Sequence, residues 1–497
     1  MSEQESTYKR ILKSTSIFGL VQLFNLLISV VRHKFFAVIV GPTGYGIFSL
    51  LYSAFDLVKQ GSGLGIDVTG VKKFAETTEK REKGKVAAIL IKLSILTGIA
   101  GTLILMMLSY NLSSWAFGDG RKTLAIVLIS VAVLFRQLIS AQTAVMQGSG
   151  KLKFLAKTNL LGNFYSLLFT LPLFYFFKID AILPSILLSA IISFIISYIY
   201  YSKMDIEKYE VSFKGAVKEG KDILYFGSLI ALNGFLPTLS NYLIQLYINS
   251  TGGIIHVGLF NVGQLIINSY VGIIFTAMTM EYYPRLISFN KNNKKEGAAV
   301  NQQAIISMLI IMPVIVLFTE FMPVIIKILL SEKFTGSIPM LSWMILAMYF
   351  KAVSFCMGYV IIARADSAVF MKTSIVFNAI YMTLCITGYH LGGLEGLGKG
   401  FIIYYALHLI AMYLISKFRY KLSFDKELFK IFVFGLTACL ALLLVNLYLE
   451  SYLRHIMFIL LLMICTLFSY VEMNRRLNVK NLILNYIVKK RANGNNK

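Results

Sequence analysis

The sequence predicts an all-α polytopic membrane protein with about 14 transmembrane helices. Hydrophobic residues make up 57% of its 497 positions and charged residues only 14%, and the mean hydropathy is +0.71. Apolar runs recur along the whole chain, and a helix that spans a bilayer needs about 20 such residues. Soluble domains are much less apolar, so a lipid bilayer is the expected environment.

Each predicted span is an apolar run that ends at charged residues or at glycine and proline. The predicted spans are 15–40, 44–68, 86–108, 123–146, 154–177, 180–201, 222–248, 254–280, 299–319, 338–363, 367–390, 397–416, 431–449 and 455–472. The loops between them are short and leave no room for a soluble domain. The first run is too long for a signal-peptide core, so no cleavage is expected. The four cysteines lie in apolar runs without paired spacing, so no disulfide framework or metal site is predicted.

The formal charge of +24 is mainly a topology signal. With the N-terminus inside, cytoplasmic segments carry 35 Lys and Arg and the opposite loops carry seven. This alternation follows the positive-inside rule in every loop. Both termini are therefore predicted to be cytoplasmic, and the placement of the cations excludes nucleic acid as the partner.

An internal repeat divides the predicted helices into two parallel halves. At a shift of 215 residues, Lys157-Thr158-Asn159 falls on Lys372-Thr373-Ser374, and Arg136 falls on Lys351. Near a shift of 208, Asn25 falls on Asn233, and near 212, Gly46-Ile47-Phe48 falls on Gly258-Leu259-Phe260. Parallel repeats are a transporter architecture with the substrate site where the halves meet. We expect a six-helix lobe at 1–205, a second at 206–420 around a central cavity, and a helical hairpin with a basic tail at 421–497.

Six cations lie inside the predicted spans, where a charge costs roughly 2.5–3.5 kcal/mol. They are Arg32, Lys34, Lys59, Lys92, Arg136 and Lys351. Lys34 and Lys92 are near enough to the surface for snorkelling, whereas Arg136 and Lys351 lie roughly 20 Å from the outer end of their helices. Several cations facing one cavity are costly unless an anion binds among them.

Helical spacing places these charges on polar stripes. One stripe is Gln22, Asn25, Ser29 and Arg32; others run through Asp56 and Lys59, through Arg136 and Ser140, and through Asn261, Gln264 and Asn268. Polar stripes on spanning helices face protein or a water-filled cavity, because lipid offers them no partner. Asp56 and Lys59 also allow a second interpretation, a structural ion pair at i and i+3. His33 lies on a different helix face from Arg32, and a structural role is expected for it.

The segment from Phe18-Gly19 through Arg32-His33-Lys34 to Gly41-Pro42-Thr43-Gly44-Tyr45-Gly46-Ile47-Phe48 resembles the Wzx-type O-antigen and polysaccharide flippases of the multidrug/oligosaccharidyl-lipid/polysaccharide exporter superfamily. The resemblance extends over the whole chain in helix layout. It implies alternating access in the bacterial cytoplasmic (inner) membrane, with an undecaprenyl-pyrophosphate-linked oligosaccharide moved from the cytoplasmic to the periplasmic leaflet. It also implies that cations hold the pyrophosphate, at Arg32 and Lys59 here. The related cell-wall precursor flippases place a cation in the eighth span, where this chain has amides.

The predicted substrate-binding residues are therefore Arg32, Lys59, Arg136 and Lys351 for the anionic headgroup, with Asn25, Asp56, Asn233 and Asn268 beside them. No catalytic residue, metal or cofactor is predicted, and coupling to protons, sodium or the membrane potential is left open. Polysaccharide polymerase machinery is a candidate partner. The alternatives are a cation-coupled multidrug exporter, which needs intramembrane carboxylates, a membrane enzyme of lipid-linked glycan assembly, which the short loops oppose, and a non-transporting scaffold.

Overall fold

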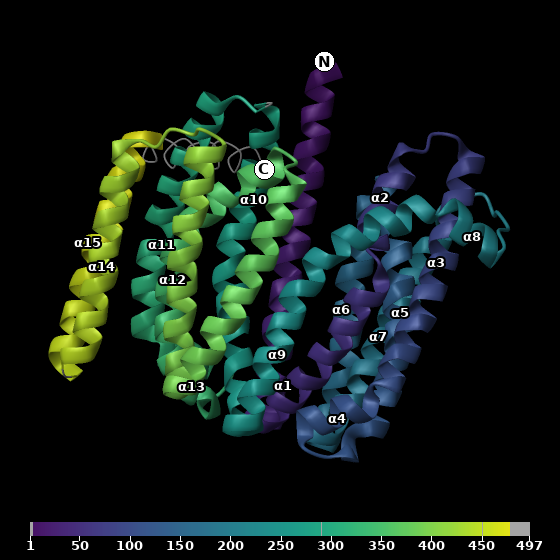
Figure 1. Ribbon diagram of the computed structural model, residues 1–497, viewed down its shortest axis with the longest axis horizontal. Helices are drawn as coiled ribbons and strands as arrows, with labels where there is room; N and C mark the ends of the chain where they lie inside the picture. The colour runs from purple at the N-terminus through teal and green to yellow at the C-terminus, as the bar shows by residue number, and fades with distance from the viewer. Residues whose placement is uncertain (1–2, 290, 450, 478–497) are drawn as a thin grey trace, which may run out of the picture. The chain divides into compact units, whose positions relative to one another are not determined.

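The computed structural model describes residues 3–289, 291–449 and 451–477, and regular secondary structure in these ranges is helical throughout (Figure 1). A helix satisfies its own backbone hydrogen bonds, which a membrane-spanning segment requires. The α-helices are α1 Glu3–Gly63, α2 Ile66–Glu76, α3 Lys80–Met107, α4 Ser109–Phe117, α5 Thr123–Gly148, α6 Leu152–Phe177, α7 Ile182–Ser202, α8 Phe213–Glu219, α9 Lys221–Leu265, α10 Gly272–Ser288, α11 Asn293–Leu329, α12 Ile338–Ala363, α13 Ser367–Leu414, α14 Lys426–Tyr448 and α15 Ser451–Leu477. Five short helical turns, η1 to η5, join some of them: Gly120–Lys122, Lys178–Ala181, Ile266–Val271, Glu332–Ser337 and Ile415–Arg419. The prediction of an all-α polytopic membrane fold is confirmed.

Ten helical segments in the described ranges are long and apolar enough to cross a bilayer. Four of them, Phe24–Glu76, Leu152–Ser202, Lys221–Ser288 and Ser367–Arg419, are 51 to 68 residues long. A single crossing needs about 20 residues, and each of the four contains the boundary between two neighbouring predicted spans. Membrane-spanning helices are therefore present along the chain, and the number of 14 crossings stays a prediction.

Glycines in left-handed conformations break two of the long helices at equivalent places in the repeat. Gly41 has φ 63° and ψ −171° within α1, and Gly253, 212 residues later, has φ 80° and ψ 173° within α9. Residues with a Cβ rarely adopt such angles, whereas glycine does so at little cost. Helix α1 changes direction between its N-terminal part and the part that leads to α2 (Figure 1), and Gly41 is the residue within it whose backbone angles are not helical.

The segments that follow these two breaks cross each other at glycine. A methyl group on Gly46 would lie 2.1 Å from the carbonyl oxygen of Ile254, and one on Gly258 would lie 2.1 Å from that of Pro42. Each contact is the repeat equivalent of the other, since all four residues are related by a shift of 212. Small residues allow membrane helices to approach this closely. The crossing therefore has local two-fold pseudo-symmetry.

The chain packs as two compact units, the first comprising Met1–Asn261 with Lys327–Phe334 and the second Val262–Ile326 with Thr335–Lys497. In unit 1, α3 packs on α5, α5 on α7 and α6 on α7, around a core that includes Leu90, Leu93 and Val145. In unit 2, α12 packs along α13. These units are defined by packing, whereas the lobes predicted above are defined by the repeat, and the lobe boundaries stay a prediction.

Arginine–carboxylate contacts join helix ends in unit 2. Arg364, at the end of α12, donates through Nε and Nη2 to Glu296 of α11 at 2.8 and 2.5 Å, and the Glu296 side chain is only 1% exposed. Asp366 accepts from Arg419 Nε at 2.9 Å, and this hydrogen bond lowers the pKa of Asp366. Both contacts lie where one helix ends and the next begins, so they fix the connection between α12 and α13.

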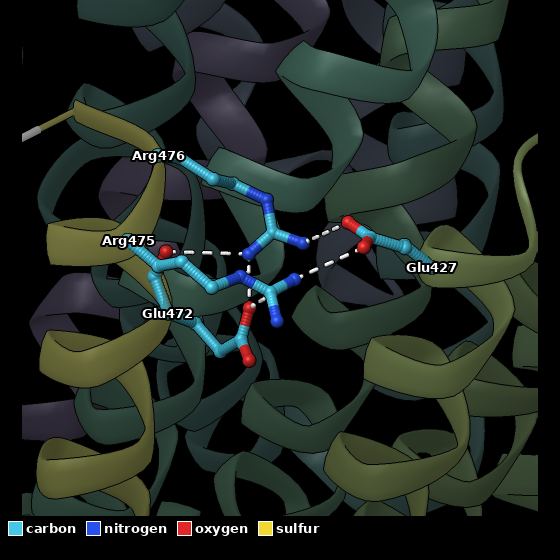
Figure 2. A network of polar contacts seen from close by, with 4 residues as sticks. All are labelled: Glu427, Glu472, Arg475 and Arg476. Atoms are coloured by element: carbon cyan, nitrogen blue, oxygen red, sulfur yellow. Dashed lines mark hydrogen bonds and ion pairs between the residues drawn. The ribbon is translucent and has the colours of Figure 1, made fainter.

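The last two helices form the predicted C-terminal hairpin. Glu427, in the first turn of α14, accepts from Arg475 at 3.0 Å and from Arg476 at 2.5 Å, near the end of α15 (Figure 2). Arg476 also contacts Glu472, one turn earlier on α15. The start of one helix is thereby tied to the end of the other, as an antiparallel pair requires.

Candidate functional site

A cavity of about 290 Å³ lies inside unit 1 and has two arginines in its wall. Arg32 comes from α1 before the break at Gly41, and Arg136 comes from the middle of α5. The remaining wall is partly hydroxylated, with Thr170 from α6 and Ser185 and Ser189 from α7. The aromatic part of the wall consists of Phe36, Phe48, Tyr52, Phe55 and Phe174. The structure thus brings together two of the four predicted cations, which lie more than 100 positions apart in the sequence.

Arg32 is held by a hydrogen bond to α6, and another residue of its polar stripe contacts the same place on α6. Its Nη2 atom donates to the carbonyl oxygen of Asn163 on α6 at 3.0 Å. The side-chain amide of Asn163 in turn donates to Asn25 Oδ1 at 3.1 Å, and Asn25 lies two stripe positions before Arg32. Asn25 is therefore a residue that positions Asn163 and, through it, Arg32. The neighbouring His33 shares a 2.8 Å hydrogen bond with the Tyr45 hydroxyl, but it also lines the same cavity as Arg32, so the expectation that the two residues face different ways was wrong.

Both arginines of this cavity lack an acidic partner. In the ranges that the structure describes, no carboxylate lies within ion-pair distance of Arg32 or Arg136. Asn163 supplies a neutral acceptor for one of the guanidinium groups, and neutral acceptors do not cancel a charge. Guanidinium groups bind carboxylates and phosphates in a bidentate manner. The two arginines of this cavity can therefore bind a carboxylate or a phosphate.

Lys59 lies in a different environment, because it has an acidic neighbour on its own helix. Its Nζ atom is 3.7 Å from Asp56 Oδ1, and both side chains are a little more than a quarter exposed. Neither residue lines the arginine cavity. Gln137, from α5, donates to the backbone carbonyl of Lys59 at 2.9 Å and ties this part of α1 to α5. The geometry accords with the i, i+3 ion pair, while leaving both groups accessible.

Asn233, on α9 in unit 1, has a buried Oδ1 atom with no hydrogen-bond partner among the described residues. An unsatisfied buried amide oxygen costs free energy. The repeat pairs Asn233 with Asn25, but the two residues have different partners, since Asn25 accepts a hydrogen bond from Asn163. Asn25 and Asn233 are therefore equivalent in the sequence repeat, but they make different hydrogen bonds.

The other two predicted residues, Lys351 and Asn268, line a second cavity of about 530 Å³ inside unit 2. Lys351 Nζ lies over the rings of Phe275 and Tyr405, 5.4 and 5.6 Å from their centroids. Asn268 Nδ2 donates to Gln264 Oε1 at 2.7 Å, and Gln264 donates to the Tyr381 hydroxyl at 2.9 Å. Two residues of the amide stripe predicted on the eighth span, Gln264 and Asn268, are thus hydrogen-bonded to each other, whereas Asn261 donates to the carbonyl oxygen of Val257 on its own helix.

The sequence did not point to the hydroxyl and aromatic residues that complete the unit 1 cavity. Ser185 and Ser189 are one helical turn apart on α7, and this i, i+4 spacing is the signal that was available. The aromatic residues gave none, because phenylalanine is common in membrane helices and its face cannot be assigned without the packing. The backbone carbonyl of Asn163, which orients Arg32, has no signature in side-chain patterns.

Comparison with known proteins identifies the family. The family model for polysaccharide biosynthesis proteins matches residues 35–339, more than half of the chain. A Shigella flexneri protein provisionally named an O-antigen transporter is 22% identical over 339 residues, covering 66% of this chain and 79% of that protein.

Solved structures with the same fold are membrane transporters. The lipid II flippase MurJ in an inward closed conformation is similar with a TM-score of 0.67 and 14% identity, over 93% of this chain and 99% of that one. A multidrug resistance MATE transporter of the MOP superfamily in an inward-facing conformation gives 0.63 and 16% identity, over 82% and 96%. The chain has the fold of these multi-pass membrane proteins, and by its sequence it belongs to the family of polysaccharide biosynthesis proteins.

Proposed function

We propose that this protein is a flippase that moves an undecaprenyl-pyrophosphate-linked polysaccharide repeat unit, such as an O-antigen unit, from the cytoplasmic to the periplasmic leaflet of the bacterial inner membrane. The observation that carries the proposal is the unit 1 cavity, where Arg32 and Arg136 face the same space without a carboxylate in the described ranges. Two guanidinium groups suit a pyrophosphate, which carries about two negative charges at neutral pH. The polyprenyl tail remains in the lipid during transfer.

The family and the relatives support this substrate class. The matching family is described by polysaccharide biosynthesis, and the names of the relatives specify an O-antigen transporter and a lipid II flippase. Transfer proceeds by alternating access, with both termini in the cytoplasm as the positive-inside rule indicates. Movement against a gradient draws on protons, sodium or the membrane potential, and the polysaccharide polymerase machinery receives the product.

The proposal is tested in a deletion strain that carries plasmid copies of the gene. Arg32→Gln and Arg136→Gln each remove a positive charge and keep a polar side chain of similar length. We expect export to fall at least about ten-fold, since a charged hydrogen bond contributes roughly 1.5–3 kcal/mol. Lipid-linked repeat units should accumulate on the cytoplasmic face, as measured by mass spectrometry and by protection from an externally added glycosidase.

Lys72→Gln is the matched control, because Lys72 is 78% exposed and its ion pair with Glu76 lies on the surface of α2. This variant should export as the wild type does. Normal export by both arginine variants, at normal protein abundance in the membrane, would contradict the proposal.

The second candidate function is a cation-coupled multidrug exporter, which the similarity to MATE transporters favours. Such a protein binds cationic drugs at intramembrane carboxylates. Here Asp56 already faces Lys59 at 3.7 Å, and the cavity of unit 1 has two arginines in its wall. Drug efflux from cells that express the wild type distinguishes the two functions: the exporter predicts raised resistance to cationic dyes, and the flippase predicts none.

A further inference from the structure

A third cavity, of about 300 Å³, lies inside unit 2 and has both positive and negative side chains in its wall. Each of the helices from α11 to α15 contributes to this wall, and the polar residues are Glu320, Trp343, Glu395, Asn446 and Arg454. All five residues lie at or near the predicted outer end of their spans. Tryptophan is enriched at that depth, where lipid headgroups meet the protein. The cavity is therefore expected to lie at the level of the outer headgroups.

One acidic residue of the cavity already has a positive partner. Glu395 Oε1 lies 2.8 Å from Lys399 Nζ in an ion pair, and it accepts a hydrogen bond from Trp343 Nε1 at 3.4 Å. Lys399 Nζ also lies 5.3 Å from the centroid of the Trp343 ring. The charge of Glu395 is thereby balanced within the protein, and Trp343 is held in place by both residues.

Arg454 is a positive residue of the cavity whose charge is not balanced in this way. Its Nε atom is buried and has no hydrogen-bond partner among the residues that the structure describes. No carboxylate in those ranges lies within ion-pair distance of its guanidinium group. A buried N–H donor without an acceptor costs free energy. A ligand that brings an acceptor into the cavity would remove this cost.

Glu320 provides a negative charge in the same cavity. Its side chain is 15% exposed, and its ion-pair partner is His455 on α15. At neutral pH an unperturbed imidazole is mainly uncharged, and an uncharged ring donates a hydrogen bond without cancelling a negative charge. In the described ranges, Glu320 and Arg454 form no ion pair with each other although both line this cavity. The cavity therefore presents one positive and one negative group that are held apart.

We propose that this cavity binds the headgroup of a phosphatidylethanolamine molecule from the outer leaflet, with the phosphate against Arg454 and the ammonium group against Glu320. A guanidinium group binds a phosphate through two parallel hydrogen bonds, and a primary ammonium group has three N–H donors for a carboxylate. Phosphatidylglycerol would leave the carboxylate without a counter-ion, and the quaternary ammonium group of phosphatidylcholine has no N–H donor. The site is separate from the arginine cavity of unit 1 and does not depend on the flippase function.

Apolar residues next to Arg454 give a lipid access to the cavity. Tyr452 and Leu453, which precede Arg454 on α15, are 78% and 60% exposed, and Leu444 on α14 is 56% exposed. In a membrane protein, exposed apolar surface of this kind faces the acyl chains. The chains of the bound lipid therefore stay in the bilayer while its headgroup enters the cavity.

The test measures lipid binding to the full-length protein in detergent by native mass spectrometry. The probes are dioctanoyl phosphatidylethanolamine, dioctanoyl phosphatidylcholine and dioctanoyl phosphatidylglycerol. We expect the wild type to bind the ethanolamine lipid about ten-fold more tightly than the other two. Arg454→Gln should weaken all three lipids about ten-fold, because all three contain the phosphate. Glu320→Gln should weaken the ethanolamine lipid alone, so that its preference disappears.

Lys430→Gln is the matched control, because Lys430 is an exposed cation near the opposite end of α14, and it should bind all three lipids as the wild type does. Equal affinities of the wild type for the three lipids would overturn the proposal, as would no binding of any of them. A preference that survives Glu320→Gln, or an equal loss of all three lipids in that variant, would also overturn it.

Glycerophosphoethanolamine, which has the same headgroup without acyl chains, distinguishes a lipid from a soluble ligand. At equal concentration it should not displace the ethanolamine lipid, and displacement would show that the cavity binds a soluble phosphate compound instead. None of these outcomes bears on the arginine cavity, whose test is export from the deletion strain.

Discussion

Charged residues inside this protein fall into two groups that differ in their partners. Arg364 lies against the buried carboxylate of Glu296, and Lys59 lies near Asp56. Arg32 and Arg136 share a cavity and have no acidic neighbour in the described ranges. A charge with a fixed counter-ion supports the fold, whereas a charge without one is available for a ligand. The distinction can be tested, because the two groups predict opposite effects of mutation on stability and on transport.

Removal of Arg364 should destabilise unit 2. Glu296 is 1% exposed, and Arg364→Ala would leave its carboxylate buried without a counter-ion, at a cost of about 3–5 kcal/mol. We expect a large fall in the temperature at which the detergent-solubilised protein loses its monodisperse peak in size-exclusion chromatography. Lys72→Ala is the control, because the exposed Lys72–Glu76 pair contributes roughly 0–1 kcal/mol. Equal melting of both variants would show that the buried pair is not a stabilising contact.

The candidate site was only partly predictable from the sequence at the level of residues. Depth in the helix and the polar stripe were enough to predict that Arg32 and Arg136 lie in the interior, and the stripe also contained Asn25. Which cations share a cavity depends on the rotation of each helix against its neighbours, and the pattern of a single helix does not contain that information. Lys59 illustrates this, because its stripe is as polar as that of Arg32 and yet it lies outside the arginine cavity.

At the scale of elements, the sequence predicted where the long helices break. It did not predict that helix continues directly on both sides of a break. Glycine and proline between apolar runs predicted the boundary at 41–44, and the structure places a single non-helical residue there, Gly41. The π-helix at Ile266–Val271 was not predicted, because one additional residue in a turn changes neither composition nor hydropathy. Glycine content therefore locates a bend, whereas its geometry depends on the packing around it.

Neither Gly46 nor Gly258 should tolerate a larger residue at the point where their helices cross. In Gly46→Ala the new methyl carbon would lie 2.1 Å from the Ile254 carbonyl oxygen, so the helices must separate, at a cost of about 1–3 kcal/mol. Gly258→Ala should have a similar effect, since it meets Pro42 in the equivalent way. Thermal stability of the purified variants measures this.

Gly162→Ala provides the comparison for the glycine crossing. Its nearest neighbour, the Ser193 Oγ atom, would be 3.7 Å from the added methyl group, and alanine is the better helix former. This variant should be as stable as the wild type or slightly more so. If Gly46→Ala behaved in the same way, the close crossing would not exist in the folded protein.

At the scale of the whole molecule, composition predicted the environment and the helical class, because only a bilayer accommodates so apolar a chain. The sequence did not predict how the chain divides into the two compact units. Residues Lys327–Phe334 begin in the last turn of α11 and belong to unit 1, although the rest of that helix belongs to unit 2. The ring centroid of Phe334 lies 5.6 Å from that of Tyr45. Contacts of this kind between distant segments leave no periodic signal.

The orientation of the chain can be tested with cysteine labelling. The four native cysteines are buried and should give little background reaction with a membrane-impermeant maleimide. Glu79→Cys, in a loop predicted to be cytoplasmic, should react only after the cells are permeabilised. Asp119→Cys, on the opposite side, should react in intact cells. The reverse pattern would invert the proposed topology and with it the direction of transport.

The tight turn at Gly41 has a consequence for biogenesis. Because one glycine replaces an entire loop, the two arms of α1 cannot be separated by a hydrophilic segment while the ribosome delivers them to the membrane. They must partition into lipid together, as a preformed pair, and the same holds for the arms of α9 around Gly253. An epitope tag or protease site inserted at either glycine should therefore block maturation, whereas one inserted between α7 and α8 should be accepted.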